Sequence, residues 1–423
     1  MRSLLMKRRV VITGVGVVAP GGVGKEKFWS RVKEGRPAAG PLTRFESDGL
    51  PVKIAAEAAD FDPREFLSQR WMSRTERYTQ FALAASILAA GDAGLVLEGA
   101  ATRRAGVFEG TSAGSLSAIF DQHRKFLANG SRPVDPTDLV RGMSGNASGS
   151  IALFFHLNGP AVTFSQGCVS SSYAIHYGFR KIQTGELEVA FVGGAEAPIS
   201  KELFALLSSV RLLSTQNDDP PSACKPFDAR RDGIVVGEGG AILILEELNR
   251  ALKRGAPIYA EVAGVGETTD AYHPTAPEPE GEMIAEAMRR ALAEAGLEAE
   301  EVDYLNAHGS ATRLNDVVET KAIKKAFGAS AQKLPVSSTK ATTGHLLGAC
   351  GALELAACAL AMKEGWLPPT ANFEVADPSC DLDYIPRRGR AARIRAAMSN
   401  TFSFGGRNAS VVIKAFTHNQ KGG

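Results

Sequence analysis

The 423-residue chain lacks the features that mark several broad classes of protein. Its five cysteines form no C-x-x-C pair, so we expect neither a disulfide framework nor a zinc site. No apolar run reaches the ~18–20 residues that span a bilayer. The formal net charge is only +2, without a long basic run, which argues against a nucleic-acid partner. We therefore expect no metal, no membrane span and no nucleic acid, in a protein of the reducing cytoplasm.

What the chain does contain is ordinary for a globular protein, with 44% hydrophobic and 22% charged residues. Basic residues precede an apolar run at the N-terminus, as they do in a signal peptide. However, the run at residues 10–18 is short, rich in β-branched residues and interrupted by glycine. These properties favour a buried strand.

Strand-like and helix-like segments alternate along the chain, which predicts an α/β fold with functional groups at the ends of strands. The sequence Ala263-Gly-Val-Gly266 echoes Thr13-Gly-Val-Gly16 in the first expected strand. Such an echo indicates an internal repeat. We predict two similar α/β halves, residues 1–255 and 256–423.

Residues 161–185 hold the strongest candidate for a reactive group. The alternating run at 161–164 breaks at Ser165-Gln166-Gly167, and Cys168 follows, directly before apolar residues at helical spacing. Peptide N–H groups and the positive end of the dipole at a helix start favour the nucleophilic thiolate. A lone cysteine is usually a small buried hydrophobe, and that interpretation is kept for Cys224, Cys350, Cys358 and Cys380.

Two histidines lie where expected strands give way to turns. His308 follows the apolar segment 302–306, and His345 lies at the start of the long apolar segment 344–363. A helix N-terminus disfavours the imidazolium ion, so His345 is expected to be neutral and to donate a hydrogen bond. Isolated histidines are more often core or surface residues than catalysts, so both need support from other groups.

Two further features supply that support. Lys340 precedes His345 on the same turn, and Glu354 lies on a helix face that can meet this lysine; alone, such a pair is usually structural. The glycine turn at residues 399–408 carries two phenylalanines. Its peptide N–H groups can complete an oxyanion hole with that of Cys168.

Several long motifs make the chain resemble a known enzyme family. They span almost the whole chain and read VVITGVGVVAP, KPFDARRDGIVVGEGG, LNAHGSAT, VSSTKATTGHLLGACGALE and FSFGGRNAS. The chain is similar to the type II β-ketoacyl-[acyl carrier protein] synthases, condensing enzymes of the thiolase fold that include the ketosynthase subunits of polyketide systems. The resemblance implies two similar α/β halves in a layered α-β-α-β-α architecture.

The resemblance also implies an acyltransferase that performs a decarboxylative Claisen condensation. An acyl group on Cys168 would react with malonyl-carrier protein during fatty-acid or type II polyketide chain elongation. No metal or organic cofactor is implied, because the phosphopantetheine arm belongs to the acyl carrier protein. The expected partners are that carrier and either a second copy of the chain or a chain-length-factor-like paralogue.

Family roles carry over to individual positions of the chain by motif. The matches to the catalytic triad and its supporting pair are Cys168, His308, His345, Lys340 and Glu354. The backbone N–H groups of Cys168 and Phe404 would form the oxyanion hole, and Phe404 would gate the site. The matches to acyl-pocket or pantetheine contacts are Ala113, Thr275, Thr312 and Phe402.

Some positions depart from the family pattern. Ser165-Gln166-Gly167 replaces the commoner wording before the nucleophile, Arg313 stands where proline is usual, and Arg407 where threonine is usual. These arginines point to an unusual carrier or substrate. Ala113 is smaller than the pocket-gating residue of many fatty-acid members, so we expect a roomier acyl pocket that extends to a dimer interface.

Alternatives stay open at this point. The chain can be the catalytic half of a heterodimer with a chain-length factor, or it can form a homodimer. A non-catalytic chain-length factor shares the fold but lacks the cysteine nucleophile, which disfavours it. A thiolase usually needs a second catalytic cysteine, and Cys350 and Cys380 lack suitable settings. A purely structural α/β protein would leave the triad unexplained.

Overall fold

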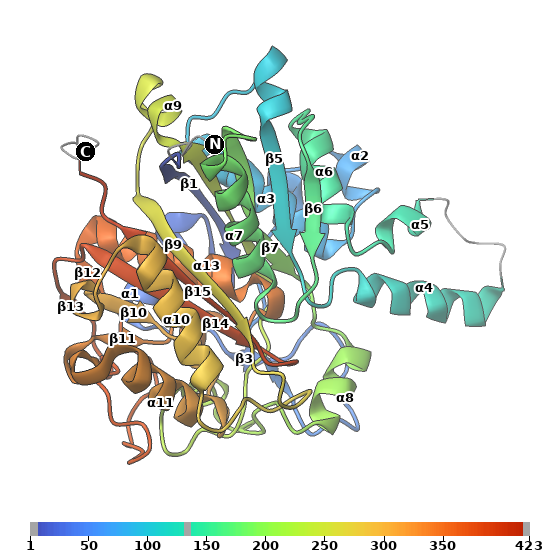
Figure 1. The fold of residues 1–423 in the computed structure, drawn as a ribbon. Helices are drawn as coiled ribbons and strands as arrows, with labels where there is room; N and C mark the ends of the chain where they lie inside the picture. The colour runs from blue at the N-terminus through green and yellow to red at the C-terminus, as the bar shows by residue number, and fades with distance from the viewer. Residues whose placement is uncertain (1–6, 131–136, 418–423) are drawn as a thin grey trace.

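The main strands of the molecule form one continuous path of paired neighbours (Figure 1). The computed structural model describes residues 7–130 and 137–417. The main strands of the first half are β1 (Val10–Ala19), β5 (Ala105–Gly110), β6 (Ala161–Phe164), β7 (Val189–Glu196) and β8 (Gly239–Glu247). Those of the second half are β9 (Ala260–Thr269), β10 (Tyr304–Asn306), β11 (Val336–Ser337), β14 (Ala396–Ser403) and β15 (Arg407–Lys414).

The strand order of the first half is repeated in the second half, on the other side of a seam formed by β1 and β9. The first half runs β6-β5-β7-β8-β1 and the second runs β11-β10-β14-β15-β9, so each strand has a counterpart at the same place in the other half. The halves meet where β1 pairs antiparallel with β9 through three residue pairs, Val10 with Val262, Val11 with Glu261 and Ile12 with Ala260. That residues 1–255 and 256–423 are separate domains stays a prediction.

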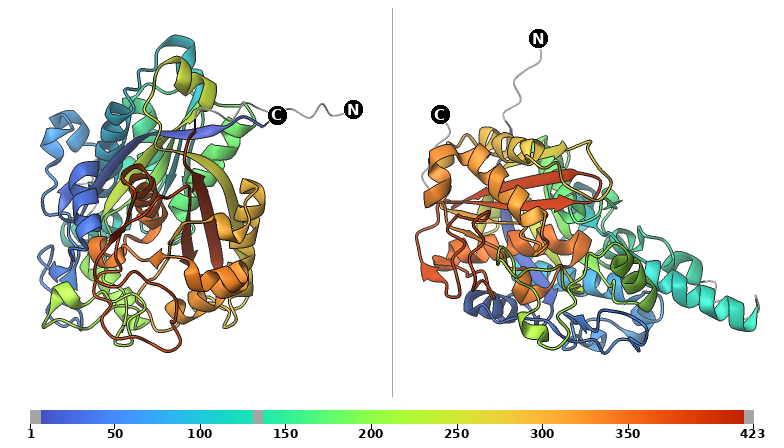
Figure 2. Two further views of the ribbon diagram at one scale, coloured as in Figure 1. Left: turned by 90° about the vertical axis from the view of Figure 1, so that its left-hand side faces the viewer. Right: turned by 90° about the horizontal axis from the view of Figure 1, so that it is seen from below.

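Helices cover both outer faces and fill the space between the halves. The inner helices are α7 (Ser170–Gln183) and α13 (Cys350–Glu364), which contact strands of both halves. On the outside, α3 (Arg77–Asp92) packs on β1, β8 and β7, while α10 (Glu282–Ala295) packs on β9 and β15 (Figure 2). The predicted α/β fold of two similar, layered halves is confirmed.

Glycines explain the sequence echo between the first strand of each half. A Cβ atom on Gly16 of β1 would lie 1.9 Å from the backbone oxygen of Ala85 in α3. A Cβ on Gly266 of β9 would lie 1.9 Å from the backbone oxygen of Ala287 in α10. Since no other residue fits such an approach, both halves bring an outer helix against the strand in the same way.

Three sequence-based boundaries differ from the structure. The sequence pattern predicts a helix from Lys201 to Leu213, but the helix α8 is Lys201–Ser209. The sequence also offers Ser73 or Thr75 as the cap of the long helix that follows them, but α3 begins at Arg77 without a side-chain cap, and Thr75 donates its hydroxyl to the Trp71 carbonyl instead. The third difference concerns the long apolar helix: α13 begins at Cys350, after a 3-10 turn, so His345 lies ahead of the helix and not at its start.

An unexpected arm projects from the body of the molecule. The helix α4 (Leu116–Asn129) has no buried residue and extends away from the layers, followed by the short helix α5 (Asp138–Arg141) (Figures 1 and 2). The remaining longer helices are α1 (Lys25–Glu34), α6 (Asn146–Phe154), α9 (Leu248–Lys253) and α11 (Asn315–Phe327). The short elements are β2 (Gly22–Val23), β3 (Gly40–Pro41), β4 (Ile54–Ala55), α2 (Gln69–Met72), α12 (Lys340–Thr343), β12 (Trp366–Leu367) and β13 (Arg390–Ala391). No helix in the described ranges has the length and hydrophobicity that crossing a bilayer requires.

Candidate active site

His308 lies in a tightly held turn directly after β10. The backbone N–H groups of His308 and Gly309 each donate to a carboxylate oxygen of Glu319, at 2.8 Å. The Ser338 hydroxyl donates to the Gly309 carbonyl at 2.8 Å. Burial raises the pKa of Glu319 to about 7, although the two N–H donors counteract it. Glu319 is not among the residues predicted from the sequence, because nothing in an ordinary helical pattern marks a carboxylate that binds a distant turn.

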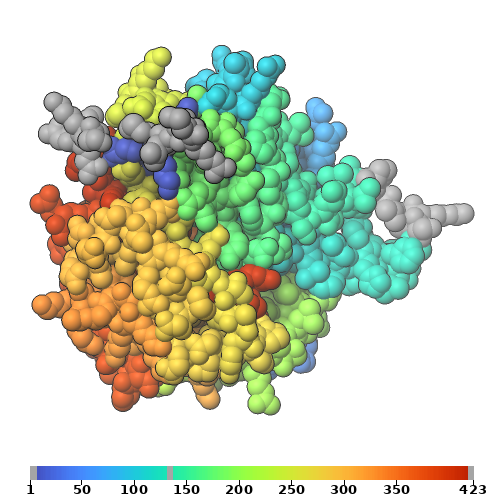
Figure 3. Space-filling model, in the orientation of Figure 1, coloured from blue at the N-terminus to red at the C-terminus, as the bar shows by residue number. Residues whose placement is uncertain are grey.

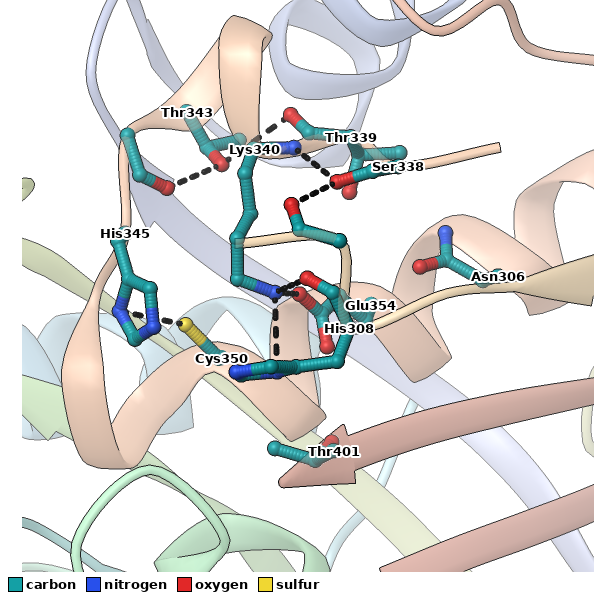
Figure 4. A network of polar contacts seen from close by, with 12 residues as sticks. Asn306, His308, Ser338, Thr339, Lys340, Thr343, His345, Cys350, Glu354 and Thr401 are labelled. Atoms are coloured by element: carbon teal, nitrogen blue, oxygen red, sulfur yellow. Dashed lines mark hydrogen bonds and ion pairs between the residues drawn. The ribbon is translucent and has the colours of Figure 1, made fainter. Parts of the chain in front are cut away.

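Lys340 is the buried centre of the site (Figure 4). Its ammonium group donates to the His308 carbonyl and to the Glu354 carboxylate, and it lies 3.4 Å from His308 Nδ1. Burial alone would lower the pKa of Lys340, but the charge and hydrogen bond of Glu354, together with the nearby Cys350 and Glu319, outweigh it and raise the pKa above its usual value. The structure therefore brings together the predicted lysine–glutamate pair, and it adds a direct link to His308.

His345 faces His308 from a separate turn. The two ring centroids are 5.4 Å apart and the ring planes are nearly perpendicular, at 87°. His345 Nδ1 accepts the Leu347 N–H at 3.1 Å and lies 3.5 Å from the Cys350 sulfur. A ring nitrogen that accepts a hydrogen bond carries no proton, so the proton of the neutral ring is on Nε2. The same holds for His308, whose Nδ1 can only accept from the Lys340 ammonium group.

Both imidazoles are neutral, but not for the reason that the sequence suggested. Burial lowers the pKa of His308 and of His345 well below the usual range, and the positive charge of Lys340 lowers both further. The explanation from a helix N-terminus is wrong for His345, because α13 begins only at Cys350. The expected neutral state follows from desolvation and a nearby cation.

Cys168 lies between β6 and α7, on the sharp turn that the sequence predicts. Gly167 has a φ of +67°, a conformation that glycine adopts without strain, and α7 begins at Ser170. The residue is partly buried, and desolvation of its thiol raises the pKa of Cys168 to about 11, despite the opposing charge of Lys340. The raised pKa contradicts the expectation of a thiolate in the resting protein, because burial favours the neutral thiol.

The strand β14 connects Cys168 to the histidines. The Phe402 ring lies 5.6 Å from the His308 ring, centroid to centroid. The next residue, Ser403, accepts the Cys168 N–H through its hydroxyl oxygen at 2.8 Å. The starts of α7 and α13 also meet, because the Ala352 N–H donates to the Ser171 hydroxyl at 3.1 Å. The nucleophile candidate and the histidines thus share one region, although they come from different halves.

The turn between β14 and β15 is tied to the loop of residues 270–275, which ends at Thr275, a predicted pocket or pantetheine contact. The Gly405 N–H donates to the Pro274 carbonyl, and the Asp270 N–H donates to the Gly406 carbonyl, both at 2.7 Å. The turn reaches the surface, where a red segment is visible between yellow and green ones (Figure 3). Phe404 is 40% exposed there. Its gating role and its N–H in an oxyanion hole stay predictions.

The residues assigned to pocket or pantetheine contacts have identifiable surroundings. The Ala113 N–H is held by the Glu196 carboxylate, at 3.2 Å from Oε2, and the exposed Thr275 donates its N–H to His273 Nδ1 at 3.1 Å. The Thr312 and Ser310 hydroxyl groups are hydrogen-bonded at 2.9 Å. With Phe402, these residues stay predictions as substrate contacts.

The two unusual arginines have different surroundings. The Arg407 guanidinium group lies over its own turn, with Nη1 3.4 Å from the Phe404 carbonyl. The backbone oxygen of Arg313 accepts a hydrogen bond from Arg231 at 3.2 Å. Among the residues that the structure describes, no group of three or more His, Cys, Asp or Glu side chains is placed to hold a metal ion.

Comparison with known proteins decides the family. The models of the N-terminal and C-terminal domains of β-ketoacyl synthase match residues 7–251 and 259–374. The chain belongs to the β-ketoacyl synthase family. This β-ketoacyl synthase is 43% identical, over 412 residues, to the 3-oxoacyl-[acyl-carrier-protein] synthase 2 of Synechocystis sp.. The match covers 97% of this chain and 99% of the relative.

Solved structures extend the similarity to polyketide enzymes. The ishigamide ketosynthase/chain length factor has a TM-score of 0.91 at 37% identity, and the match covers 97% of this chain and 100% of that one. A type II PKS ketosynthase, solved with its acyl-carrier protein and bound to the hexaketide, has a TM-score of 0.89 at 32% identity with the same coverage. This β-ketoacyl synthase is thus an acyltransferase of the condensing class that acts in fatty-acid or polyketide chain elongation.

Proposed function

We propose that the chain lengthens an acyl group by two carbons, with Cys168 as nucleophile and His308 and His345 as hydrogen-bond donors. In the first step, the Cys168 sulfur attacks the carbonyl carbon of a carrier-bound acyl thioester. The bond from that carbon to the carrier's sulfur breaks. Because Cys168 is protonated at rest, its proton leaves with the carrier thiol, and the acyl group remains as a thioester on Cys168.

In the second step, a malonyl thioester on the carrier loses its carboxylate. The carbon–carbon bond to the carboxylate breaks, carbon dioxide leaves, and the electron pair forms an enolate. The Nε2–H groups of His308 and His345 donate to the enolate oxygen. The enolate carbon attacks the acyl group on Cys168, the carbon–sulfur bond breaks, and the sulfur takes a proton from water. The product is a 3-oxoacyl thioester on the carrier.

The observation that supports this mechanism is the occupation of both Nδ1 atoms. Lys340 and the Leu347 N–H bind Nδ1 of His308 and His345 respectively, which leaves each ring with a proton on Nε2. The pKa of each imidazole is lowered by burial, so neither can act as a cation at neutral pH. Two neutral N–H donors suit an oxygen that gains negative charge during the reaction, because they are already oriented when that charge forms.

An acyl adduct on Cys168 tests the proposal. Incubation with the hexanoyl thioester of N-acetylcysteamine is expected to add one hexanoyl group to the intact protein, and peptide mapping should locate it on Cys168. The adduct should be absent from Cys168→Ala and retained in Cys380→Ala, since Cys380 is a buried thiol near Thr320 and Arg231. An adduct on another cysteine, or none, would overturn the assignment.

The carrier and the compartment belong to the same proposal. An acyl carrier protein brings both substrates on its phosphopantetheine arm, so the chain itself needs no bound cofactor. All five cysteines are free thiols, which fits the reducing cytoplasm.

We also propose that the arm, residues 116–130 and 137–143, and the edge strand β6 form the interface with a second thiolase-fold subunit. Within the described residues, β6 pairs only with β5 and leaves its other edge open. The exposed apolar side chains of the arm are Ile119, Phe126, Leu127, Leu139, Val140 and Met143. Exposed apolar side chains grouped on one projecting segment are typical of an interface. The second subunit is a copy of the chain or a chain-length-factor-like paralogue.

Native mass spectrometry distinguishes these states. The chain alone is expected at twice its own mass if it is a homodimer, and only with a co-expressed paralogue if it is a heterodimer. Leu127→Glu should break either dimer, whereas Val96→Glu, which alters an equally exposed residue outside the arm, should not. A dimer that persists in Leu127→Glu would place the interface elsewhere.

A further inference from the structure

The backbone N–H of Cys168 is already occupied in the resting protein. The Ser403 hydroxyl oxygen accepts it at 2.8 Å. The neighbouring Gly167 leaves room for this contact, because a Cβ atom there would lie 2.1 Å from the same hydroxyl oxygen. The absence of a side chain at Gly167 thus makes room for the Ser403 hydroxyl, although Cys168 and Ser403 are 235 positions apart in the chain.

This contact conflicts with the proposed chemistry. The inference rests on the proposed function and adds to it the oxyanion hole expected from the sequence, in which the Cys168 N–H donates to the oxygen that becomes negative as the thioester is attacked. An N–H group makes one well-aligned hydrogen bond, so the substrate oxygen and the Ser403 hydroxyl cannot both hold it. One of them must leave before the other binds.

We propose that Ser403 is a positioning residue that fills the oxyanion site of Cys168 in the resting enzyme and is displaced by the thioester. The hydroxyl keeps the N–H paired and aimed at the place where the substrate oxygen will lie. A rotation about χ1 of Ser403 moves the hydroxyl away without breaking the strand pairing of β14. The turn that follows stays tied to the 270–275 loop through Gly405 and Gly406.

The expected effect is a modest brake on acylation. A neutral hydrogen bond that must be exchanged for another corresponds to roughly a threefold to tenfold change in rate. Ser403→Ala removes the competing acceptor and leaves the Cys168 N–H free. Acylation by hexanoyl-N-acetylcysteamine should therefore be about threefold to tenfold faster in Ser403→Ala than in the wild type.

Alkylation of Cys168 by iodoacetamide is the second measurement. It distinguishes the loss of a competing hydrogen-bond acceptor from a general opening of the site. Alkylation generates no oxyanion, so it should be no faster in Ser403→Ala than in the wild type. Ser403→Thr keeps the hydroxyl and should behave as the wild type does. Ser399→Ala, on the same strand, controls for loss of a serine from β14.

Each outcome decides the inference. Faster acylation with unchanged or slower alkylation supports it. Equal increases in both rates would mean that alanine merely opens the site, and unchanged or slower acylation would mean that the hydroxyl assists the substrate; either result overturns the inference. If the wild type forms no adduct on Cys168, the proposed function itself fails, which is a distinct result.

Discussion

His308→Ala is expected to lower the rate of malonyl-thioester decarboxylation by about 10²–10³-fold, the usual loss when one donor to a developing oxyanion is removed. The ring of His308 is buried, neutral and carries its proton on Nε2, since Nδ1 faces the Lys340 ammonium group. Alanine removes that hydrogen-bond donor without changing the charge of the site. Release of carbon dioxide from a malonyl carrier thioester measures the effect directly.

Two controls separate the donor from the fold. His308→Asn keeps an N–H group and should retain part of the lost rate, while Cys168→Ala should still decarboxylate, because that step uses no thiol. The pKa of His308 is lowered by burial, so its neutral form is present both above and below the usual titration range. The rate should therefore not fall between pH 8 and pH 6 through protonation of this ring. Unchanged decarboxylation in His308→Ala would remove the histidine from the mechanism.

Lys340→Met is expected to lower the free energy of unfolding by about 3–5 kcal/mol, which is the cost of removing one partner of a buried ion pair. The side chains of Lys340 and Glu354 are only 1% and 3% exposed. Without the lysine, the Glu354 carboxylate is left in the interior without its cation, and the His308 carbonyl loses a donor. Urea denaturation followed by circular dichroism measures the change.

The matched comparison is an ion pair on the surface. Lys321 and Glu280 lie 3.0 Å apart with side chains 42% and 62% exposed, so Lys321→Met should cost less than about 1 kcal/mol. The double change Lys340→Met with Glu354→Leu should recover most of the lost stability, because no unpaired charge remains. A Lys340→Met variant as stable as Lys321→Met would show that the buried pair is not what holds this site together.

Local patterns predicted the parts of the fold that depend on neighbours in sequence. The apolar spacing of residues 282–295, followed by Gly296, predicts a helix there, and α10 spans Glu282–Ala295. The alternating residues 161–164 form the strand β6 as predicted, and Gly167 forms the predicted turn before Cys168. The glycine echo between residues 13–16 and 263–266 marks a real structural repeat, because the same helix approach requires it in both halves.

Features that depend on distant contacts were not predictable in the same way. The pKa of Cys168 is set by the burial that the rest of the chain imposes, and no local pattern reveals it. Glu319 and Ser403 act on residues that other strands bring to them. The arm was missed for another reason: α4 is a helix without a buried face, so no core constrains its pattern.

The seam between β1 and β9 has a consequence for how the parts of the site are held together. Cys168 is carried by the first half, whereas both histidines and Lys340 are carried by the second. The gap from sulfur to imidazole therefore depends on how the two halves pack together, whereas the spacing of the two rings is set within the second half alone. Helices α7 and α13, which contact strands of both halves, and the hydrogen bond from the Cys168 N–H to Ser403 hold the two parts of the site together.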